Sequence, residues 1–332
     1  MLDQLQRAQE ISAAGLAALP DGTSSAPLVL RGAVAGWPFV REARRSDEAA
    51  VDYLGRFYND RPVSTLVAAP SEGGRFFYRA DSKRMNFESA SALLPDILKA
   101  LLDERNAEDP AAIAMQAISA PDCLPGLEAE NPNPFVPPDS QARVWIGNKV
   151  TVAPHFDVAE NIACVVAGRR RFILFPPEQT PNLYPGPMDL TPANVPISMV
   201  AMDNSELGRF PKYREALAGA FVADLEPGDA IYIPYLWWHG VKSLGGFNVL
   251  VNYWFNRDEA AARFPLVPML HLAFRAYRDM APEHREAWRA LYDHYVFQTG
   301  GDPMSALYPQ HHETGGPAEC SRTPLRLTKP GP

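Results

Sequence analysis

The chain has 332 residues, of which 46% are hydrophobic, enough to fill a sizeable core without disulfide bonds. Its 31 basic and 39 acidic side chains leave a net charge of -8, and no basic run stands out beyond the arginines at 169–171, which disfavours nucleic acid as a partner. Three widely spaced cysteines, no leader-like N-terminus and no long apolar stretch predict a cytoplasmic protein that does not enter a membrane.

Residues 1–110 are predicted to form helices and strands that pack on a β domain. Apolar side chains recur at near-helical spacing over residues 2–17, and residues 27–32 have the pattern of a short strand and turn. A further helix is expected after Ser91, which can cap it, because the leucines and isoleucine of residues 94–102 recur every three or four positions.

From residue 111 to residue 257 the pattern changes to short strands separated by turns such as Pro227-Gly228-Asp229. The predicted strands are 113–118, 143–147, 161–166, 171–175, 230–233 and 247–254. Many short strands at this spacing predict a mostly β fold, a double-sheet jelly roll with flanking helices. Residues 178–216 are weakly periodic and are predicted to form an insertion over one mouth of the barrel.

The C-terminal part returns to a helical pattern. Residues 258–311 contain two apolar stripes, one running from Leu266 to Tyr277 and one from Trp288 to Val296. These helices either cover the domain's own surface or form a homodimer interface rich in aromatic residues. Residues 312–332 lack an apolar pattern and are predicted to be a mobile tail.

The most informative motif is His155-Phe156-Asp157, with His239 as a third candidate metal ligand. Alternate residues of a strand face the same side, so His155 and Asp157 can both point into a barrel. Two imidazoles and one carboxylate leave the opposite face of the metal open for substrate and O2, an arrangement typical of non-haem Fe(II) oxygenases. An isolated H-x-D is close to chance, but the other histidines lie in the predicted helices or the tail, which leaves His155 and His239.

Several motifs in the strand region come in the order found in one family and cover roughly residues 113–256. They are Trp145-Ile146-Gly147-Asn148, His155-Phe156-Asp157, Asn161, the run 168–177, Leu183-Tyr184-Pro185, Arg209-Phe210-Pro211, the run 227–234, Trp237-Trp238-His239 and Val251-Asn252-Tyr253-Trp254. Residues 27–38 also look like the family's entry strand. On these residues the chain resembles the JmjC/cupin-like Fe(II)- and 2-oxoglutarate-dependent oxygenases, including the asparaginyl hydroxylase of hypoxia-inducible factor and bacterial cupin-like proteins.

The resemblance implies Fe(II) held by His155, Asp157 and His239, with 2-oxoglutarate as cosubstrate and O2 as oxidant. It also implies a cationic anchor for the far carboxylate of 2-oxoglutarate, a lysine in the asparaginyl hydroxylase, and the matching residue here is Arg170. Alternation along the strand puts Arg170 on the same face as Phe172, inside an apolar interior where it requires an anionic partner. The alternative for this basic run is a solvated turn.

The same resemblance implies that the amides of Asn161 and Asn252 line the cosubstrate pocket, although either can equally be a satisfied polar residue inside a barrel. Two positions depart from the family, because its pocket tyrosine and threonine align with Ala114 and Val152. Thr151, next to Val152, is the candidate replacement for the missing hydroxyl.

These observations predict an Fe(II)- and 2-oxoglutarate-dependent dioxygenase that hydroxylates a peptide side chain or a small metabolite. The alternative is a metal-binding cupin, either a dioxygenase or an isomerase, that does not use 2-oxoglutarate, and the changes at Ala114 and Val152 favour it. A non-catalytic binding protein is disfavoured, since two histidines and a carboxylate inside a barrel are costly to keep without a metal.

Overall fold

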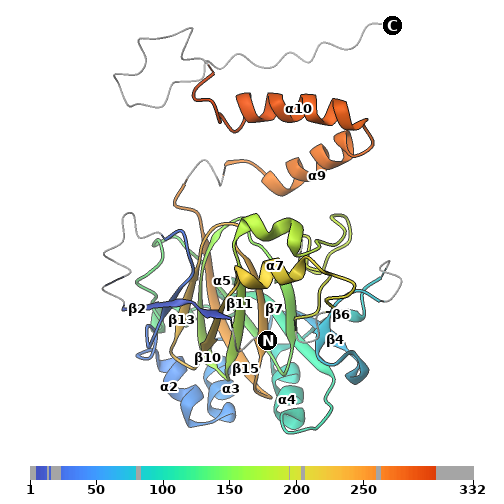
Figure 1. The fold of residues 1–332 in the computed structure, drawn as a ribbon. Helices are drawn as coiled ribbons and strands as arrows, with labels where there is room; N and C mark the ends of the chain where they lie inside the picture. Colours follow the sequence, from blue (N-terminus) through green and yellow to red (C-terminus); the bar gives the residue numbers. More distant parts are fainter. Residues whose placement is uncertain are drawn as a thin grey trace, which may run out of the picture. The chain divides into compact units, whose positions relative to one another are not determined.

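The computed structural model describes residues 5–12, 15, 24–79, 84–193, 195–202, 206–258 and 263–303. It divides into two compact parts, a barrel unit of residues 1–267 and a helical unit of residues 268–332 (Figure 1). The predicted tail at 312–332 lies outside the described residues. None of the described helices is long and apolar enough to cross a membrane.

Two β-sheets form the barrel unit. The smaller has the order β1 (Gln6–Arg7), β12 (Phe221–Leu225), β11 (Arg170–Phe175), β14 (Trp238–Ser243), β9 (Thr151–His155) and β5 (Arg75–Phe76). The larger has the order β2 (Gln9–Ile11), β3 (Leu28–Leu30), β13 (Ala230–Ile233), β10 (Glu160–Ala167), β15 (Asn248–Phe255), β8 (Ala142–Gly147), β7 (Ala112–Ser119), β4 (Val63–Ala68) and β6 (Phe87–Ala92). From β8 to β15 the strands alternate between the two sheets, except that β11 and β12 are neighbours in the smaller one, so the predicted jelly roll with flanking helices is confirmed.

The helices of the barrel unit are short. They are α2 (Pro38–Arg45), α3 (Asp47–Gly55), α4 (Leu94–Glu104), α5 (Ala120–Cys123), α6 (Leu127–Glu130) and α7 (Tyr213–Ala218), with 3-10 turns at Pro70–Glu72 and Pro177–Asn182. The helical unit contains α10 (Pro282–Tyr295) and most of α9 (Leu266–Tyr277).

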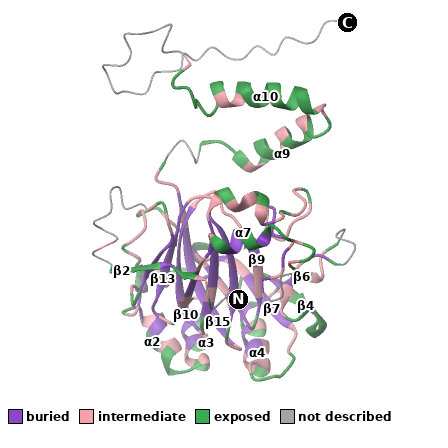
Figure 2. Cartoon of the chain, viewed as in Figure 1, coloured by how far each residue is buried: buried purple, intermediate pink, exposed green. Residues whose placement is uncertain are grey.

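Two apolar clusters account for most of the core of the barrel unit (Figure 2). One lies between the sheets, where Phe172 and Leu174 of the smaller sheet meet Val165 and Ile231 of the larger. The other joins the opposite face of the larger sheet to α2, α3 and α4, and it includes Phe39 and Leu98. The larger sheet is therefore apolar on both faces, one against the helices and one against the smaller sheet.

The N-terminal part differs from its prediction in two places. Residues 6–11, expected in a helix, form β1 and β2, because each adds to a sheet edge by parallel pairing, Gln6 with Phe221 and Gln9 with Leu28. Ser91 does not cap α4. It lies in β6, and α4 begins at Leu94 without a side-chain cap, followed by Pro95, whose missing N–H needs no partner in the first turn. N-terminal strands β3, β4 and β6 thus belong to the larger sheet itself.

The segment 178–216, predicted to be an insertion, is well packed where it is described. Leu183 and Val200 are fully buried in a cluster with Phe175 and Trp238 of the smaller sheet. A bridge between Pro185 and Ser198 closes it into a hairpin-like loop. This covering is therefore held by side-chain packing.

The predicted turn at 227–229 forms, and the Asp229 carboxylate fastens it to β3. Gly228 has a φ of +102°, and a Cβ there would lie 3.2 Å from Ala35. The buried carboxylate of Asp229 accepts hydrogen bonds from the backbone N–H of Gly32 at 2.9 Å and from the Arg31 guanidinium at 2.6 Å. Two segments almost 200 residues apart in the sequence therefore meet at one acid.

Replacing Asp229 with alanine is expected to lower the free energy of unfolding by about 2–3 kcal/mol, because the hydrogen bonds that Arg31 and the backbone of Gly32 donate to this charged acceptor are lost. Urea denaturation followed by far-UV circular dichroism would measure the change. The matched control is Asp103→Ala, which removes an exposed carboxylate that pairs with Lys99, and it should leave the midpoint in place. If both variants have the same urea midpoint, the carboxylate of Asp229 does not stabilise the fold more than an exposed one does.

Candidate metal centre

The two histidines are brought together by the pairing of β9 with β14. His155 and His239 are direct partners in this antiparallel pair, and their ring centroids lie 4.4 Å apart. A bulge lies between Val241 and His239, so that Val152 and His155, three residues apart, both face the space between the sheets. Residues 84 positions apart in the sequence thus meet at one place.

Each imidazole is oriented by its own strand. Nδ1 of His155 lies 3.0 Å from the carbonyl oxygen of Ala153, and Nδ1 of His239 lies 3.1 Å from that of Trp237. A carbonyl oxygen only accepts, so both Nδ1 atoms donate and carry the proton. This tautomer leaves both Nε2 lone pairs free for a metal, which is the usual support for a histidine ligand.

Asp157 completes the set. One ligand atom from each of His155, Asp157 and His239 can be chosen so that all three lie within 4.8 Å of one another, and Nε2 of His239 is 3.5 Å from Oδ2 of Asp157. Burial, followed by the charge of His155, lowers the pKa of His239 to about 4, although Asp157 opposes the shift. His239 is therefore neutral at physiological pH, as a metal ligand must be.

The position of Asp157 has a different cause from the one predicted. Strand β9 ends at His155, so strand alternation does not orient the carboxylate. Instead, the indole Nε1 of Trp254 donates to Oδ2 of Asp157 at 2.9 Å, and the backbone N–H of Leu236 donates to its carbonyl at 3.2 Å. The sequence analysis names Trp254 only as part of a family motif, so its contact with Asp157 is a feature of the site that sequence reasoning missed. Its place on β15, two residues after Asn252, was the available signal.

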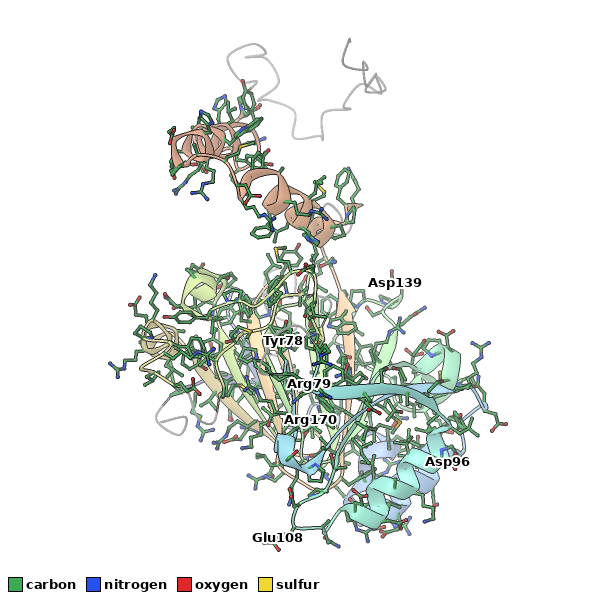
Figure 3. All side chains as sticks on the ribbon, turned by 90° about the vertical axis from the view of Figure 1, so that its right-hand side faces the viewer. Tyr78, Arg79, Asp96, Glu108, Asp139 and Arg170 are labelled. Carbon is green, nitrogen blue, oxygen red and sulfur yellow. The ribbon has the colours of Figure 1, made fainter. Side chains whose placement is uncertain are left out.

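Arg170 lies between the sheets. Its strand neighbours Phe172 and Leu174 belong to the apolar cluster there, and Figure 3 marks Arg170 within the barrel. Its Nη2 lies 3.5 Å from the carbonyl oxygen of Trp145, and its Nε has no hydrogen-bond partner among the described residues. Burial lowers the pKa of Arg170 to about 10. A buried cation with so few partners is costly unless an anion binds beside it.

A chain of hydrogen bonds joins the predicted amides. Nε1 of Trp145 donates to Oδ1 of Asn252 at 2.6 Å, and Nδ2 of Asn252 donates to Oδ1 of Asn161 at 3.1 Å. The Trp145 ring also meets Trp254 edge to face at 5.9 Å. Asn161 and Asn252 are thus brought together next to the indole that holds Asp157.

Thr151 is not brought to this cluster. It is aligned with Lys242 and Arg75 on either side, whereas its neighbour Val152 packs in the cluster between the sheets, so Thr151 belongs to the opposite face of β9. Ala114 packs with Leu66 and other apolar side chains. Neither residue therefore supplies a hydroxyl to the space near Arg170.

The covering segment is tied to the strand that carries His155. The backbone N–H of Ser198 donates to the carbonyl of Pro154 at 2.7 Å, and Nε1 of Trp238 donates to Oγ1 of Thr180 at 2.9 Å. The hydroxyl of Tyr78 donates to the carbonyl of Leu190 in this segment at 2.7 Å. The segment 178–216 therefore lies against the metal-binding edge of the smaller sheet.

Two imidazole nitrogens and one carboxylate suit Fe(II), because they bind a borderline metal without filling its coordination sphere. The oriented Nε2 atoms and the restrained carboxylate fit such an ion. Such a set of three ligands would leave further positions of the ion open, and Arg170 places a cation in the apolar space between the same two sheets.

Residues 23–261, most of the chain, match the sequence profile of the cupin-like domain family. The chain is 33% identical over 153 residues to HSPB1-associated protein 1 of Homo sapiens, an alignment that covers 45% of this chain and 30% of that protein. It is 32% identical over 120 residues to lysine-specific demethylase JMJ31 of Arabidopsis thaliana, covering 36% of this chain and 21% of that protein. It is 35% identical over 105 residues to JmjC domain-containing protein D of Dictyostelium discoideum, covering 31% of this chain and 22% of that protein. The aligned residues thus span less than a third of each relative.

Replacing Trp254 with phenylalanine is expected to weaken metal binding about tenfold, because the ring remains but the N–H that holds Asp157 is lost. Anaerobic titration with Fe(II), or calorimetry with Mn(II), would measure the dissociation constant. Trp37→Phe is the matched control, since that indole also donates to one oxygen, the carbonyl of Pro132, but lies in the other apolar cluster. If both variants bind metal like the wild type, Trp254 only packs.

Proposed function

The chain belongs to the cupin-like domain family, and from this membership and the site geometry we propose that it is an Fe(II)- and 2-oxoglutarate-dependent oxygenase that hydroxylates its substrate. His155, Asp157 and His239 would hold the iron. Arg170 would bind the far carboxylate of 2-oxoglutarate. The observation that carries the cosubstrate assignment is the burial of Arg170 without an acidic partner among the described residues.

The register of the smaller sheet supports this assignment. His239 is aligned with Leu174 and Ser243 with Arg170, so the anchor lies four residues along β11 from the metal-binding histidine. At the usual rise this is about 13 Å between backbone positions. An extended arginine side chain and a five-carbon dicarboxylate together can fill that gap. The guanidinium can also bind a carboxylate through two parallel hydrogen bonds.

When bound, Fe(II) supplies the activation of O2, which couples conversion of 2-oxoglutarate to succinate and CO2 with insertion of one oxygen atom into a substrate C–H bond. The protein's own residues orient and enclose the reactants. His155 and His239 keep their protons on Nδ1, and Trp254 holds Asp157 in place. The apolar residues beside Arg170 exclude water from the carboxylate pocket, which strengthens its charge pairing.

Two substrate classes fit this chemistry, a protein side chain and a small metabolite. The name of the Arabidopsis relative, a lysine-specific demethylase, favours a protein side chain. The packed covering segment over 178–216 favours a smaller molecule, because it closes against the strand of His155. Mass spectrometry of the reaction with peptide and metabolite pools would separate the two classes by a gain of one oxygen atom.

A second candidate is a metal-binding cupin enzyme that does not use 2-oxoglutarate. The specific observation in its favour is that Ala114 and Val152 lie in apolar clusters, and Thr151 belongs to the opposite face of its strand. The carboxylate pocket therefore lacks hydroxyl donors at these positions. In this candidate, Arg170 would bind a different acid.

Visible spectroscopy of the protein under anaerobic conditions, titrated with Fe(II) and then 2-oxoglutarate, tests the proposal. We expect a metal-to-ligand charge-transfer band that is absent in His155→Ala. Arg170→Ala should require on the order of 10- to 100-fold more 2-oxoglutarate, since it loses charge-assisted hydrogen bonds. Arg171→Ala is the matched control, because Arg171 is the next residue of the strand but pairs with Asp224 on the other face.

Tight metal binding without any band at saturating 2-oxoglutarate would reject the cosubstrate and leave the second candidate. A band with the same 2-oxoglutarate requirement in Arg170→Ala and Arg171→Ala would keep the oxygenase but reject Arg170 as the anchor. Absence of metal binding by the wild type would reject both functions.

A further inference from the structure

The ligand Asp157 lies on one of two neighbouring loops that cross between the sheets. Residues 156–159 connect β9 of the smaller sheet to β10 of the larger, and residues 234–237 connect β13 of the larger sheet to β14 of the smaller. The backbone N–H of Leu236 in the second loop donates to the carbonyl of Asp157 in the first at 3.2 Å. Neither loop is part of a strand, so contacts other than strand pairing must fix where Asp157 lies.

The loop that carries Leu236 contains a strained turn. The N–H of Trp237 donates to the carbonyl of Pro234 at 3.2 Å, and inside this turn Leu236 has a φ of +62°, in the left-handed region that favours glycine. Such a conformation persists only where the surrounding contacts impose it, and strained residues cluster at binding sites. The place where the two loops meet is therefore one where the position of the backbone matters.

The loop of Asp157 is held on its other side by residues at the end of β15. The indole of Trp254 donates to Oδ2 of Asp157 at 2.9 Å. The amide of Asn256, the first residue after the strand, donates to the carbonyl of Val158 at 3.4 Å. Two successive residues of the loop thus depend on where β15 ends.

The register between β10 and β15 decides whether these contacts can form. The two strands lie side by side in the larger sheet, with β13 on the other side of β10 (Figure 1). Glu160, the first residue of β10, is paired with Phe255, the last residue of β15, and Asn161 is paired with Trp254. A shift by one residue would turn the Trp254 indole to the opposite face of the sheet, away from Asp157.

The buried carboxylate of Glu160 joins three chain segments at this end of the pair. Its Oε2 accepts hydrogen bonds from Nη1 of Arg257 at 2.7 Å and from the Tyr232 hydroxyl at 2.8 Å, and its Oε1 accepts from the backbone N–H of Arg257 at 3.2 Å. Burial, followed by the hydrogen bond with Glu160, raises the pKa of Tyr232, so that this hydroxyl keeps its proton. The start of β10, the middle of β13 and the residue two positions after β15 are therefore held together.

Arg257 is restrained on both faces of this contact. Its guanidinium carbon lies 4.6 Å from the ring centroid of Phe255, and its side chain is only 25% exposed. Breaking a buried ion pair leaves a charge without compensation, so a register that separates Arg257 from Glu160 is disfavoured.

We infer that Arg257 and Glu160 are positioning residues for the metal ligand Asp157. Neither belongs to the set of ligands. They fix the register of β10 with β15, and that register sets the Trp254 indole against the Asp157 carboxylate. This inference rests on the metal site of the proposed function, but not on 2-oxoglutarate.

Arg257→Gln is expected to weaken Fe(II) or Mn(II) binding about tenfold, and Arg257→Lys should restore part of the affinity because it keeps a charged donor. Calorimetric titration with Mn(II), well below the unfolding temperature, would measure the dissociation constant. Arg31→Gln is the matched control, since Arg31 forms an ion pair of similar length with the buried Asp229, which precedes the opposite end of β13. It should lower the thermal midpoint without changing the metal dissociation constant.

Hydrogen exchange of the full chain without added metal gives a second readout. The N–H of Leu236 donates to the loop of Asp157, so it should exchange faster in Arg257→Gln than in the wild type, because the loop that accepts its hydrogen bond is less restrained. Arg31→Gln should leave the exchange of this N–H unchanged.

If Arg257→Gln lowers the thermal midpoint but matches the wild type in metal affinity or in the exchange of Leu236, the ion pair is only structural. Equal loss of metal affinity in Arg257→Gln and Arg31→Gln would also overturn the inference, because any loss of stability would then have the same effect. A wild type that binds no metal would instead reject the proposed function.

Discussion

The antiparallel pairing of β9 with β14 is the constraint on which the site depends. It sets His155 directly opposite His239, and a bulge adjusts the strand so that both rings face the space between the sheets. Each ring is then fixed by the carbonyl of the residue two positions earlier in the chain. Backbone geometry thus positions two of the three ligands, and only the third depends on side-chain contacts from elsewhere.

Arg170 and Arg171, neighbours on β11, differ in how their charges are satisfied. Arg171 is partly exposed and pairs its charge with Asp224 at 2.6 Å. Arg170, one residue away, points into an apolar cluster with one weak contact to a carbonyl. Burying this guanidinium costs desolvation free energy during folding. A carboxylate of a ligand would offset that cost only after it binds. Local instability of this kind is common at binding sites.

The two units obtain their stability differently. In the barrel unit, ion pairs and buried carboxylates such as Asp229 and Glu160 fasten turns and loops around a continuous apolar core. The described helices of the helical unit bury no side chain, and their aromatic contacts gather around Tyr277 and Tyr292. A domain that contains its own core and a hairpin that lacks one therefore coexist in a single chain.

The sequence by itself determined the fold class, because strand periodicity, the turn at 227–229 and the order of the family motifs can be read along the chain without any tertiary contact. It also identified His155, Asp157 and His239, since only residue type and spacing are needed to recognise them. Residues 6–11 were misread as a helix because pairing to a sheet edge is a tertiary contact that local spacing does not record. The structure alone decided that Asp157 is held by Trp254 and that Thr151 and Val152 face opposite sides of β9. These outcomes depend on where β9 ends and where a bulge shifts its register. Packing between segments that are distant in the chain determines both.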